Sequence, residues 1–406
     1  MKKRILATIC ALACACTMSS PVYAKDLASE TDLSTQQLDR STVQTLSEKG
    51  SYNITVRSDM SKVSPADFTT ITGTLNASNT TDTCTINVPE RAALVMYSSA
   101  LYPSADVRIE LQSQSGTLVC SQYLSSSTLE NGEDMDDGIL LEPGTYTLTY
   151  SVSGTVKDNI TYTTNLAAYA ASTEQNVEIG SGYIGFQKGG EDVYKKVTVK
   201  KSGLLAVCSY VYGSGFGEYL MTQKDDKLYI CGQSLALCNG NKKAITEQET
   251  TLKDNYYINY YAVKAGTYYV KMKYASDNYY ALGIDFKVGG TTNNTSRSKA
   301  LKLSSKYKST LMPIGGSSKT RWYKVTLKKK KKFTIYYDFY GQDGAVQVSV
   351  CNKNGKKMTL DTTIYSGRSG KLSTSRKYSK GTYYIKVSKP LTNSYSMEGL
   401  LDLKVK

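Results

Sequence analysis

Apolar and polar residues alternate in short runs along most of this chain, as in residues 194–199 and 322–327. The side chains of a β-strand point alternately to opposite faces, so this two-residue period predicts strands with one buried face. Gly, Asn, Asp and Ser separate the runs, and these are residues that turns favour. The pattern predicts an all-β protein.

One strand pattern occurs three times. Each copy contains a Gly-Thr-Tyr motif followed by an alternating run, and the motif begins at Gly144, Gly266 and Gly381. Strand pairs separated by turn residues lie upstream, and Asn354-Gly355 in the third copy is the kind of turn that most strongly signals a hairpin. Strands spaced about 8–12 residues apart are typical of a β-sandwich or jelly roll.

The first residues have the order of a secretory signal peptide. Residues 1–4 carry positive charge, residues 5–18 are apolar, and residues 22–24 form a small-x-small cleavage site. The apolar run is too short to span a bilayer, and the chain has no other apolar run that approaches the length of a transmembrane helix. We therefore expect a secreted protein with no transmembrane segment, whose retention at a cell wall would be non-covalent.

These signals predict a domain organisation. We expect a signal peptide at residues 1–24, a polar segment at 25–57, and tandem β-sandwich or jelly-roll modules at 58–171, 172–289 and 294–406. Residues 289–294 read as a short, polar, flexible linker.

The third module resembles the bacterial pre-peptidase C-terminal (PPC) domain, a β-sandwich attached to many secreted proteases and collagenases. The resemblance rests on the Asn-rich start at residues 294–303, the strand 322–325, the turn 352–355, the motif 381–384 and the hairpin 395–405. The second module matches less well and the first only loosely. The matching residues mostly form the fold, so the resemblance implies an architecture rather than a ligand.

The resemblance also bears on calcium, which some PPC domains bind. The family pattern often places Asp just before the Trp/Tyr strand. The second module has Asp192 there, but the third has Thr320-Arg321. This departure argues against calcium in the third module.

The chain contains no His, which restricts its chemistry. Ser-His-Asp and Cys-His catalysis and zinc sites with His ligands are excluded, and no Cys-x-x-Cys pair is present. We expect a protein that is not an enzyme and requires no cofactor. A carbohydrate-active enzyme stays open as an alternative, because glycoside hydrolysis needs only two carboxylates.

Residues 130–138 form an acidic stretch with three interpretations. It is a solvated loop between strands, a calcium loop in which Asp134, Asp136 and Asp137 supply oxygen ligands, or a catalytic carboxylate pair. The spacing does not match an EF-hand. Calcium is thus a candidate cofactor.

Charge is distributed unevenly along the chain. Residues 25–172 have a net charge of −10, residues 173–293 of +2, and residues 294–406, with 25 Lys and Arg against 5 Asp and Glu, of +20. The basic module contains Lys328, Lys329, Lys330, Lys331 and Lys332 in an expected turn. A solvated turn that guards against aggregation is one interpretation, and binding of an anionic polymer is the other.

Six cysteines follow the signal peptide, and buried thiols or disulfides are both open for them. Tyrosines often occur in pairs, of which one ring should face the core and the other the surface, where it could stack on a sugar or pack against a protein. The single tryptophan, Trp322, aligns with Tyr194 and reads as a strand anchor.

These features favour a secreted or surface-associated binding protein, similar to an adhesin. Its basic module would contact an anionic cell-wall polymer or acidic glycan, and the other modules a glycan, matrix or host protein. No nucleic-acid motif is present, so we expect no specific nucleic-acid partner. A carbohydrate-active enzyme and a structural component of the cell surface remain the alternatives.

Overall fold

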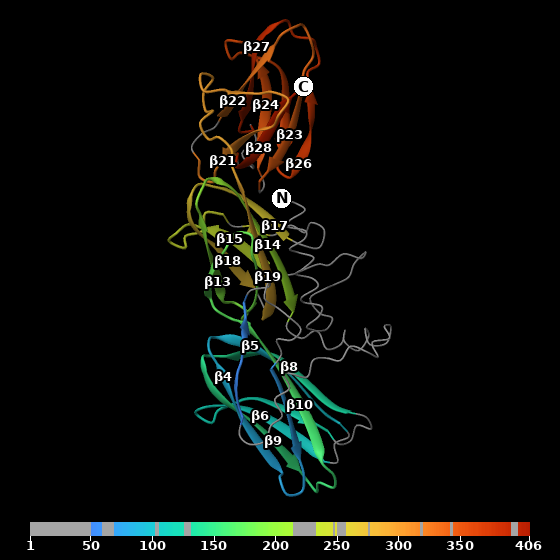
Figure 1. The fold of residues 1–406 in the computed structure, drawn as a ribbon. Coiled ribbons are helices and arrows are strands. Elements are labelled where there is room, and N and C mark those ends of the chain that lie inside the picture. The colour runs from blue at the N-terminus through green and yellow to red at the C-terminus, as the bar shows by residue number, and fades with distance from the viewer. Residues whose placement is uncertain are drawn as a thin grey trace.

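The structure is a computed structural model that describes residues 50–58, 69–101, 105–125, 131–213, 233–246, 248–249, 257–274, 277–316, 320–341, 344–390 and 397–406. The regular elements in these ranges are all β-strands, which confirms the all-β prediction. They form three pairs of sheets, which we call the first, second and third modules (Figure 1).

In the first module, one sheet has the strand order β1-β4-β9-β6-β7 and the other β2-β10-β5-β8, with β3 also paired to β10. The strands are β1 (Ser51–Asn53), β2 (Val56–Arg57), β3 (Thr69–Leu75), β4 (Thr81–Val88), β5 (Ala92–Leu101), β6 (Asp106–Ser113), β7 (Leu118–Leu124), β8 (Asn131–Leu141), β9 (Gly144–Ser153) and β10 (Ile160–Ala170).

In the second module, the two sheets have the orders β11-β13-β18-β15-β16 and β12-β19-β14-β17. The strands are β11 (Glu174–Val177), β12 (Gly182–Gln187), β13 (Asp192–Val199), β14 (Gly203–Gly213), β15 (Gln233–Cys238), β16 (Gln248–Glu249), β17 (Tyr257–Val263), β18 (Gly266–Tyr274) and β19 (Asn278–Val288).

In the third module, the orders are β20-β22-β27-β24-β25 and β21-β28-β23-β26. The strands are β20 (Leu301–Lys302), β21 (Lys308–Met312), β22 (Thr320–Leu327), β23 (Thr334–Tyr340), β24 (Ala345–Cys351), β25 (Lys357–Tyr365), β26 (Arg368–Ser373), β27 (Gly381–Ser388) and β28 (Gly399–Val405).

The three modules share one strand order, so each strand except β2 of the first module has a counterpart in the other modules. Thus β4, β13 and β22 correspond, as do β9, β18 and β27, which begin at the three Gly-Thr-Tyr motifs. Alternate residues of these strands are buried, as the two-residue period predicts: in β13, Val193, Val197 and Val199 lie in the core. Each module has its own apolar core between its sheets.

Two expectations about segment boundaries were wrong. Strands β1 and β2 lie before residue 58, and β1 pairs in parallel with β4, so part of the segment 25–57 belongs to the first module. Strands of two or three residues are too short to show an alternating pattern. The segment 289–294 is bonded into the fold rather than a free linker: Thr291 N donates to Ser309 O and Leu311 N donates to Thr291 O. The expected signal peptide, residues 1–24, lies outside the described residues.

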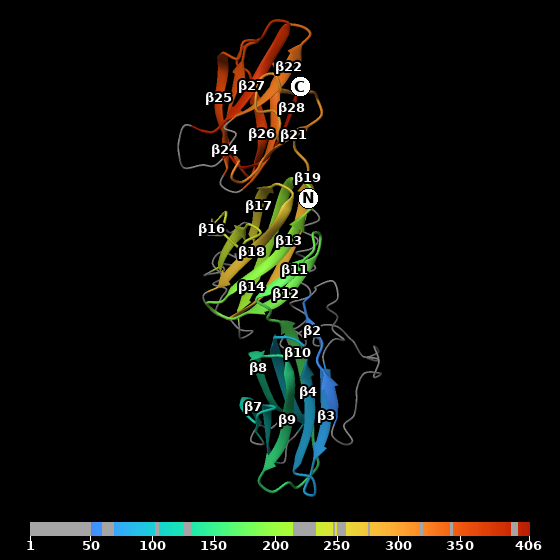
Figure 2. The ribbon, with the colours of Figure 1, turned by 90° about the vertical axis from the view of Figure 1, so that its left-hand side faces the viewer.

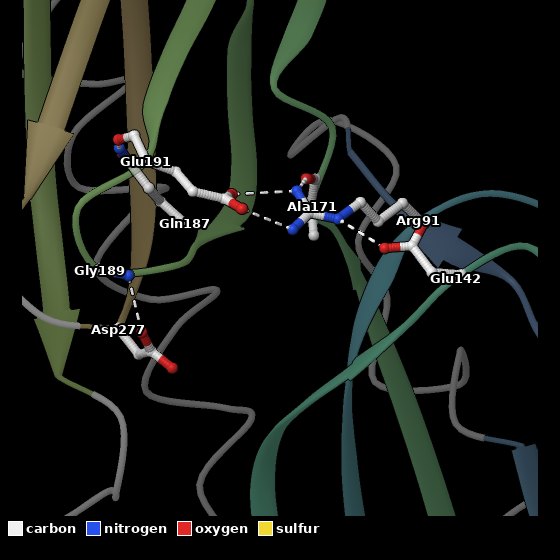
Figure 3. A network of polar contacts seen from close by, with 7 residues as sticks. All are labelled: Arg91, Glu142, Ala171, Gln187, Gly189, Glu191 and Asp277. Carbon is white, nitrogen blue, oxygen red and sulfur yellow. Dashed lines mark hydrogen bonds and ion pairs between the residues drawn. The ribbon is translucent and has the colours of Figure 1, made fainter. Parts of the chain in front are cut away.

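The first and second modules meet through an apolar cluster and a polar network. The cluster comprises Ala93, Val95, Ala167, Tyr169, Ala171, Ile184, Phe186 and Tyr279. Beside it, Arg91 in the turn between β4 and β5 lies between two carboxylates (Figure 3). Its guanidinium is 2.9 Å and 3.1 Å from the oxygens of Glu191, donates to the Ala171 carbonyl at 2.9 Å, and is 3.1 Å from Glu142.

The second and third modules meet at the corresponding positions. Leu204 of β14 packs with Ala262, Leu311 and Leu400. The Lys287 ammonium lies 2.9 Å from Asp402 Oδ2 and 4.9 Å from the centre of the Tyr340 ring. Because both junctions join one end of a module to the opposite end of the next, the modules form a row (Figures 1 and 2).

The cysteines that the structure describes form no disulfide with one another; they are Cys84, Cys120, Cys208, Cys238 and Cys351. Cys231 lies outside the described residues. For these five described cysteines, the structure favours thiols over disulfides, and all except Cys120 are buried.

Candidate anion-binding surface at the end of the third module

The lysine run predicted from the sequence forms the turn between β22 and β23. Lys328, Lys329, Lys330 and Lys332 are exposed and Lys331 is half-buried. Buried residues stand on either side of the run, Leu327 at the end of β22 and Phe333 directly before β23, and they anchor the turn in the core. The cationic side chains are therefore held outside a fixed apolar base.

Backbone hydrogen bonds tie this turn to the turn between β26 and β27. Lys331 N donates to Tyr378 O at 3.0 Å, and Tyr378 N donates to Lys331 O at 2.9 Å. Thr374 closes the same edge, because its hydroxyl accepts a hydrogen bond from Phe333 N at 3.2 Å. These hydrogen bonds thus fix the backbone of the lysine turn.

This pairing brings further cations beside the five lysines. Arg376, Lys377 and Lys380 are exposed in the β26–β27 turn, and the Arg376 guanidinium lies 5.5 Å from the centre of the Tyr378 ring. The C-terminal Lys406 exchanges two backbone hydrogen bonds of 3.1 Å with Thr334 at the start of β23. We call Lys328–Lys332, Arg376, Lys377, Lys380 and Lys406 the basic end.

No acidic residue lies in these turns. In residues 294–406 the structure describes four carboxylates, and all of them lie outside the two turns. They are Asp338, Asp361, Glu398 and Asp402. Asp361 binds Lys357, and Asp402 binds Lys287 at the module junction. Because exposed charges are screened only beyond about 8 Å at physiological ionic strength, neighbouring lysines of one turn repel each other. An anion placed among them relieves that repulsion.

The counterparts of the lysine turn in the other two modules lie beside module junctions, although Glu90, Lys200 and Lys201 within them are exposed. In the first module the turn contains Arg91, which binds Glu191 of the second. In the second module the turn leads into Leu204, which packs on the third. The third module meets the second through the other end of β23, at Tyr340. The basic end therefore lies at the end of the third module that faces away from the second.

Sequence reasoning found the five lysines and missed Arg376, Lys377, Lys380 and Lys406. A usable signal existed, because Lys380 directly precedes the third Gly-Thr-Tyr motif, and β27 begins beside the residue at which β22 ends. The register Leu327↔Gly381 expresses this proximity. Without a known strand pairing, the two turns cannot be brought together from the sequence.

The acidic stretch is not the loop that was expected between strands. Residues 131–141 form strand β8, in which Asp134 pairs with Ser98 and Asp136 with Met96 of β5. The side chains of Asp134, Asp136 and Asp137 lie outside the described residues, so their proposed calcium ligation stays a prediction. In the part of the chain that the structure describes, no group of three or more Asp, Glu or Cys side chains could hold a metal ion.

The described residues contain no helix long and apolar enough to cross a membrane.

No protein-family model matches the chain, and no curated protein matches it. Among solved structures, the chain is similar to a xanthan lyase from Paenibacillus at 13% sequence identity, over 73% of this chain and 30% of that one, with a TM-score of 0.21. The chain thus spans less than a third of the lyase, and a TM-score this low does not relate the two folds.

Proposed function

We propose that this is a secreted or cell-surface-associated binding protein without catalytic activity, whose basic end binds an anionic polymer of the cell envelope. The observation that carries the proposal is the basic end itself. Two neighbouring turns and Lys406 place their cations together at the end of the third module that faces away from the second, and the described residues of these turns include no carboxylate.

The chemistry of the basic end indicates a class of ligand. Lysine is a point charge on a flexible stem, so a cluster of lysines suits repeated negative charges without fixing their geometry. Binding of a polyanion to such a cluster releases counterions and weakens steeply with salt. A polymer bearing phosphates or carboxylates at short intervals meets these conditions, whereas a small neutral ligand does not.

The remaining modules then extend the chain away from the polymer. The two junctions use buried apolar side chains and an ion pair each, which supports a row of fixed rather than loosely linked modules. Residues 25–172 carry a net charge of −10, which opposes contact of the first module with the same polyanion. That end stays available for another partner, such as a matrix or host protein.

The test is the affinity of residues 25–406 for polyphosphate and for polygalacturonate, measured by fluorescence anisotropy from 50 to 300 mM NaCl. Replacement of Lys328, Lys329, Lys330, Lys331 and Lys332 by Ser should weaken binding of both polymers at least tenfold at the lower salt concentration. It should also flatten the salt dependence, because fewer counterions are released.

A matched control separates local charge from total charge. It removes five exposed lysines scattered over the third module, Lys299, Lys308, Lys353, Lys371 and Lys389, by replacement with Ser. We expect this control to retain most of the affinity. Equal loss in both variants, or unchanged binding in the Lys328–Lys332 variant, would show that the basic end is not the site.

A further inference from the structure

The outer face of the five-stranded sheet in the third module carries aromatic rings among cations. Trp322 and Lys324 of β22 and Tyr384 and Lys386 of β27 point away from the core, since their neighbours Tyr323 and Ile385 are buried. Cross-strand pairing places Trp322 opposite Lys386 and Lys324 opposite Tyr384. Rings and ammonium groups therefore alternate across the two central strands.

The distances show that these side chains form one group. The ring centres of Trp322 and Tyr384 lie 6.3 Å apart, at an interplanar angle of 80°. The Lys386 ammonium lies 5.8 Å from the centre of the Trp322 ring, and the Arg297 guanidinium lies 6.0 Å from that of Tyr384. Trp322 and Tyr384 are both partly exposed. We call Trp322, Tyr384, Lys324, Lys386 and Arg297 the aromatic face.

The second module has the same arrangement but neutralises it internally. Tyr194 and Tyr269 occupy the places of Trp322 and Tyr384, with ring centres 6.2 Å apart. Lys271, the counterpart of Lys386, binds Asp192 at 2.8 Å. Lys242 covers both rings, at 4.9 Å and 5.5 Å from their centres, and binds Glu174 at 2.6 Å. Tyr269 is consequently buried, with only 7% of its surface exposed.

The third module lacks both of these carboxylates. In register, Thr320 stands in the place of Asp192 and Ala300 in the place of Glu174. Among the described residues, Lys324, Lys386 and Arg297 form no ion pair. The nearest carboxylate by register, Asp361, lies two strands from Lys386 and is bound to Lys357.

In the first module, the four corresponding positions of β4 and β9 carry neither rings nor cations. The counterparts of Trp322, Lys324, Tyr384 and Lys386 are Thr83, Thr85, Thr147 and Thr149. The same strand positions are therefore compatible with a plain polar surface. The rings and cations of the third module are not required to form the sheet.

We infer that the aromatic face binds a polysaccharide built from acidic sugars. The apolar C–H face of a sugar ring packs against the negative π-face of Trp322 or Tyr384, while its carboxylate pairs with Lys324, Lys386 or Arg297. This inference deepens the proposed function, because it names a class of anionic polymer and a second set of contacts for it. It also rests on that proposal for the secreted location, where an acidic glycan is the ring-containing polyanion that the chain would meet.

The test uses the single tryptophan of the chain as a reporter. An oligogalacturonate that stacks on Trp322 should change the tryptophan fluorescence of residues 25–406 in a saturable manner, whereas polyphosphate, which has no rings, should leave it nearly unchanged. The double variant Trp322→Ala/Tyr384→Ala should bind oligogalacturonate at least tenfold more weakly in the anisotropy assay. Its affinity for polyphosphate should stay within twofold of the original.

Two variants keep the test decisive. Trp322→Tyr restores the residue type of the second module and should recover most of the oligogalacturonate affinity, which separates a lost ring from a damaged sheet. Tyr194→Ala in the second module should have no effect. An equal loss for both polymers in the double variant, or unchanged oligogalacturonate binding, would overturn the inference. Tighter binding of single-stranded DNA than of oligogalacturonate would overturn it in favour of base stacking.

The two proposals fail separately. If the lysine-turn variant binds both polymers normally while the aromatic variant loses oligogalacturonate, the basic end is wrong and the aromatic face stands. If the lysine-turn variant loses both polymers and the aromatic variant loses neither, only the aromatic face is wrong.

Discussion

The second and third modules use corresponding strands and nearly the same outward residues, yet the charge of these surfaces differs. On the five-stranded sheet, Lys271 and Lys242 of the second module bind Asp192 and Glu174. In the third module the corresponding face carries cations without carboxylate partners among the described residues. Two positions, Thr320 and Ala300, account for this difference, because they hold no charge where the second module has acids.

The ends of the two modules differ in the same way. The turn after β13 contains two exposed lysines and leads into Leu204, which is buried against the next module, whereas the turn after β22 contains five lysines, four of them exposed. A module end that no described module covers needs a polar surface. The amount of charge exceeds that need, which is why we assign the basic end a ligand.

The largest difference we expect between the two cores concerns pH. Lys195 of the second module is buried at the position that Tyr323 occupies in the third, with its ammonium 2.8 Å from Gln175 Oε1 and 5.0 Å from the centre of the Tyr280 ring. Burial away from water lowers the pKa of Lys195 from 10.5 to about 7. Unfolding therefore takes up a proton between these pH values, and the second module should become more stable as pH rises.

Between pH 7 and 9 the gain should be about 2–3 kcal/mol, from about 1.4 kcal/mol per pH unit. Above pH 9 it is opposed, because burial raises the pKa of the Cys208 thiol to about 12 and the unfolded thiol then ionises first. Lys195→Met should abolish the rise, whereas Lys196→Met, on the opposite face of β13, should keep it. Urea unfolding monitored by circular dichroism at pH 7, 8 and 9 measures this, and a parallel rise in Lys195→Met would contradict the assignment.

The next effect concerns the junction between the first two modules. Arg91→Ala removes a bidentate pair with Glu191 and a hydrogen bond to the Ala171 carbonyl, all partly buried. We expect a loss of about 1–2 kcal/mol, visible in calorimetry as a lower melting temperature of the first or second module. Arg108→Ala is the control, because the Arg108 side chain is 54% exposed, against 21% for Arg91, and its pair with Glu110 should contribute less. Equal effects of the two variants would mean that Arg91 does not couple the modules.

The smallest effect tests the comparison of the two sheet faces directly. Thr320→Asp restores the acid that the second module has at Asp192 and should neutralise part of the aromatic face. Oligogalacturonate affinity should fall about threefold, which corresponds to about 0.6 kcal/mol. Ser369→Asp adds the same charge to exposed strand β26 of the other sheet and should change the affinity less. A larger effect of Ser369→Asp would show that only total charge matters.

Much of the fold was predictable because alternation and turn residues are local signals. The hairpin 354–355, the three motif strands and the all-β class follow from such signals, and the structure confirms them. The short parallel strands β1 and β2 and the bonded segment at Thr291 were missed, since their partners lie far away in the sequence. The same reason explains the site: five adjacent lysines are visible in a sequence, but their proximity to Arg376 depends on how β22 and β27 pair.

The most direct test of the central claim is to find which lysines a polyanion covers. Residues 25–406 would be labelled with an amine-reactive reagent, with and without saturating polyphosphate, and the modified lysines quantified by mass spectrometry. We expect several-fold protection of Lys328–Lys332, Lys377, Lys380 and Lys406, with little change at Lys200 and Lys201 in the corresponding turn of the second module. Uniform weak protection over all exposed lysines, or protection that leaves Lys328–Lys332 fully reactive, would contradict it.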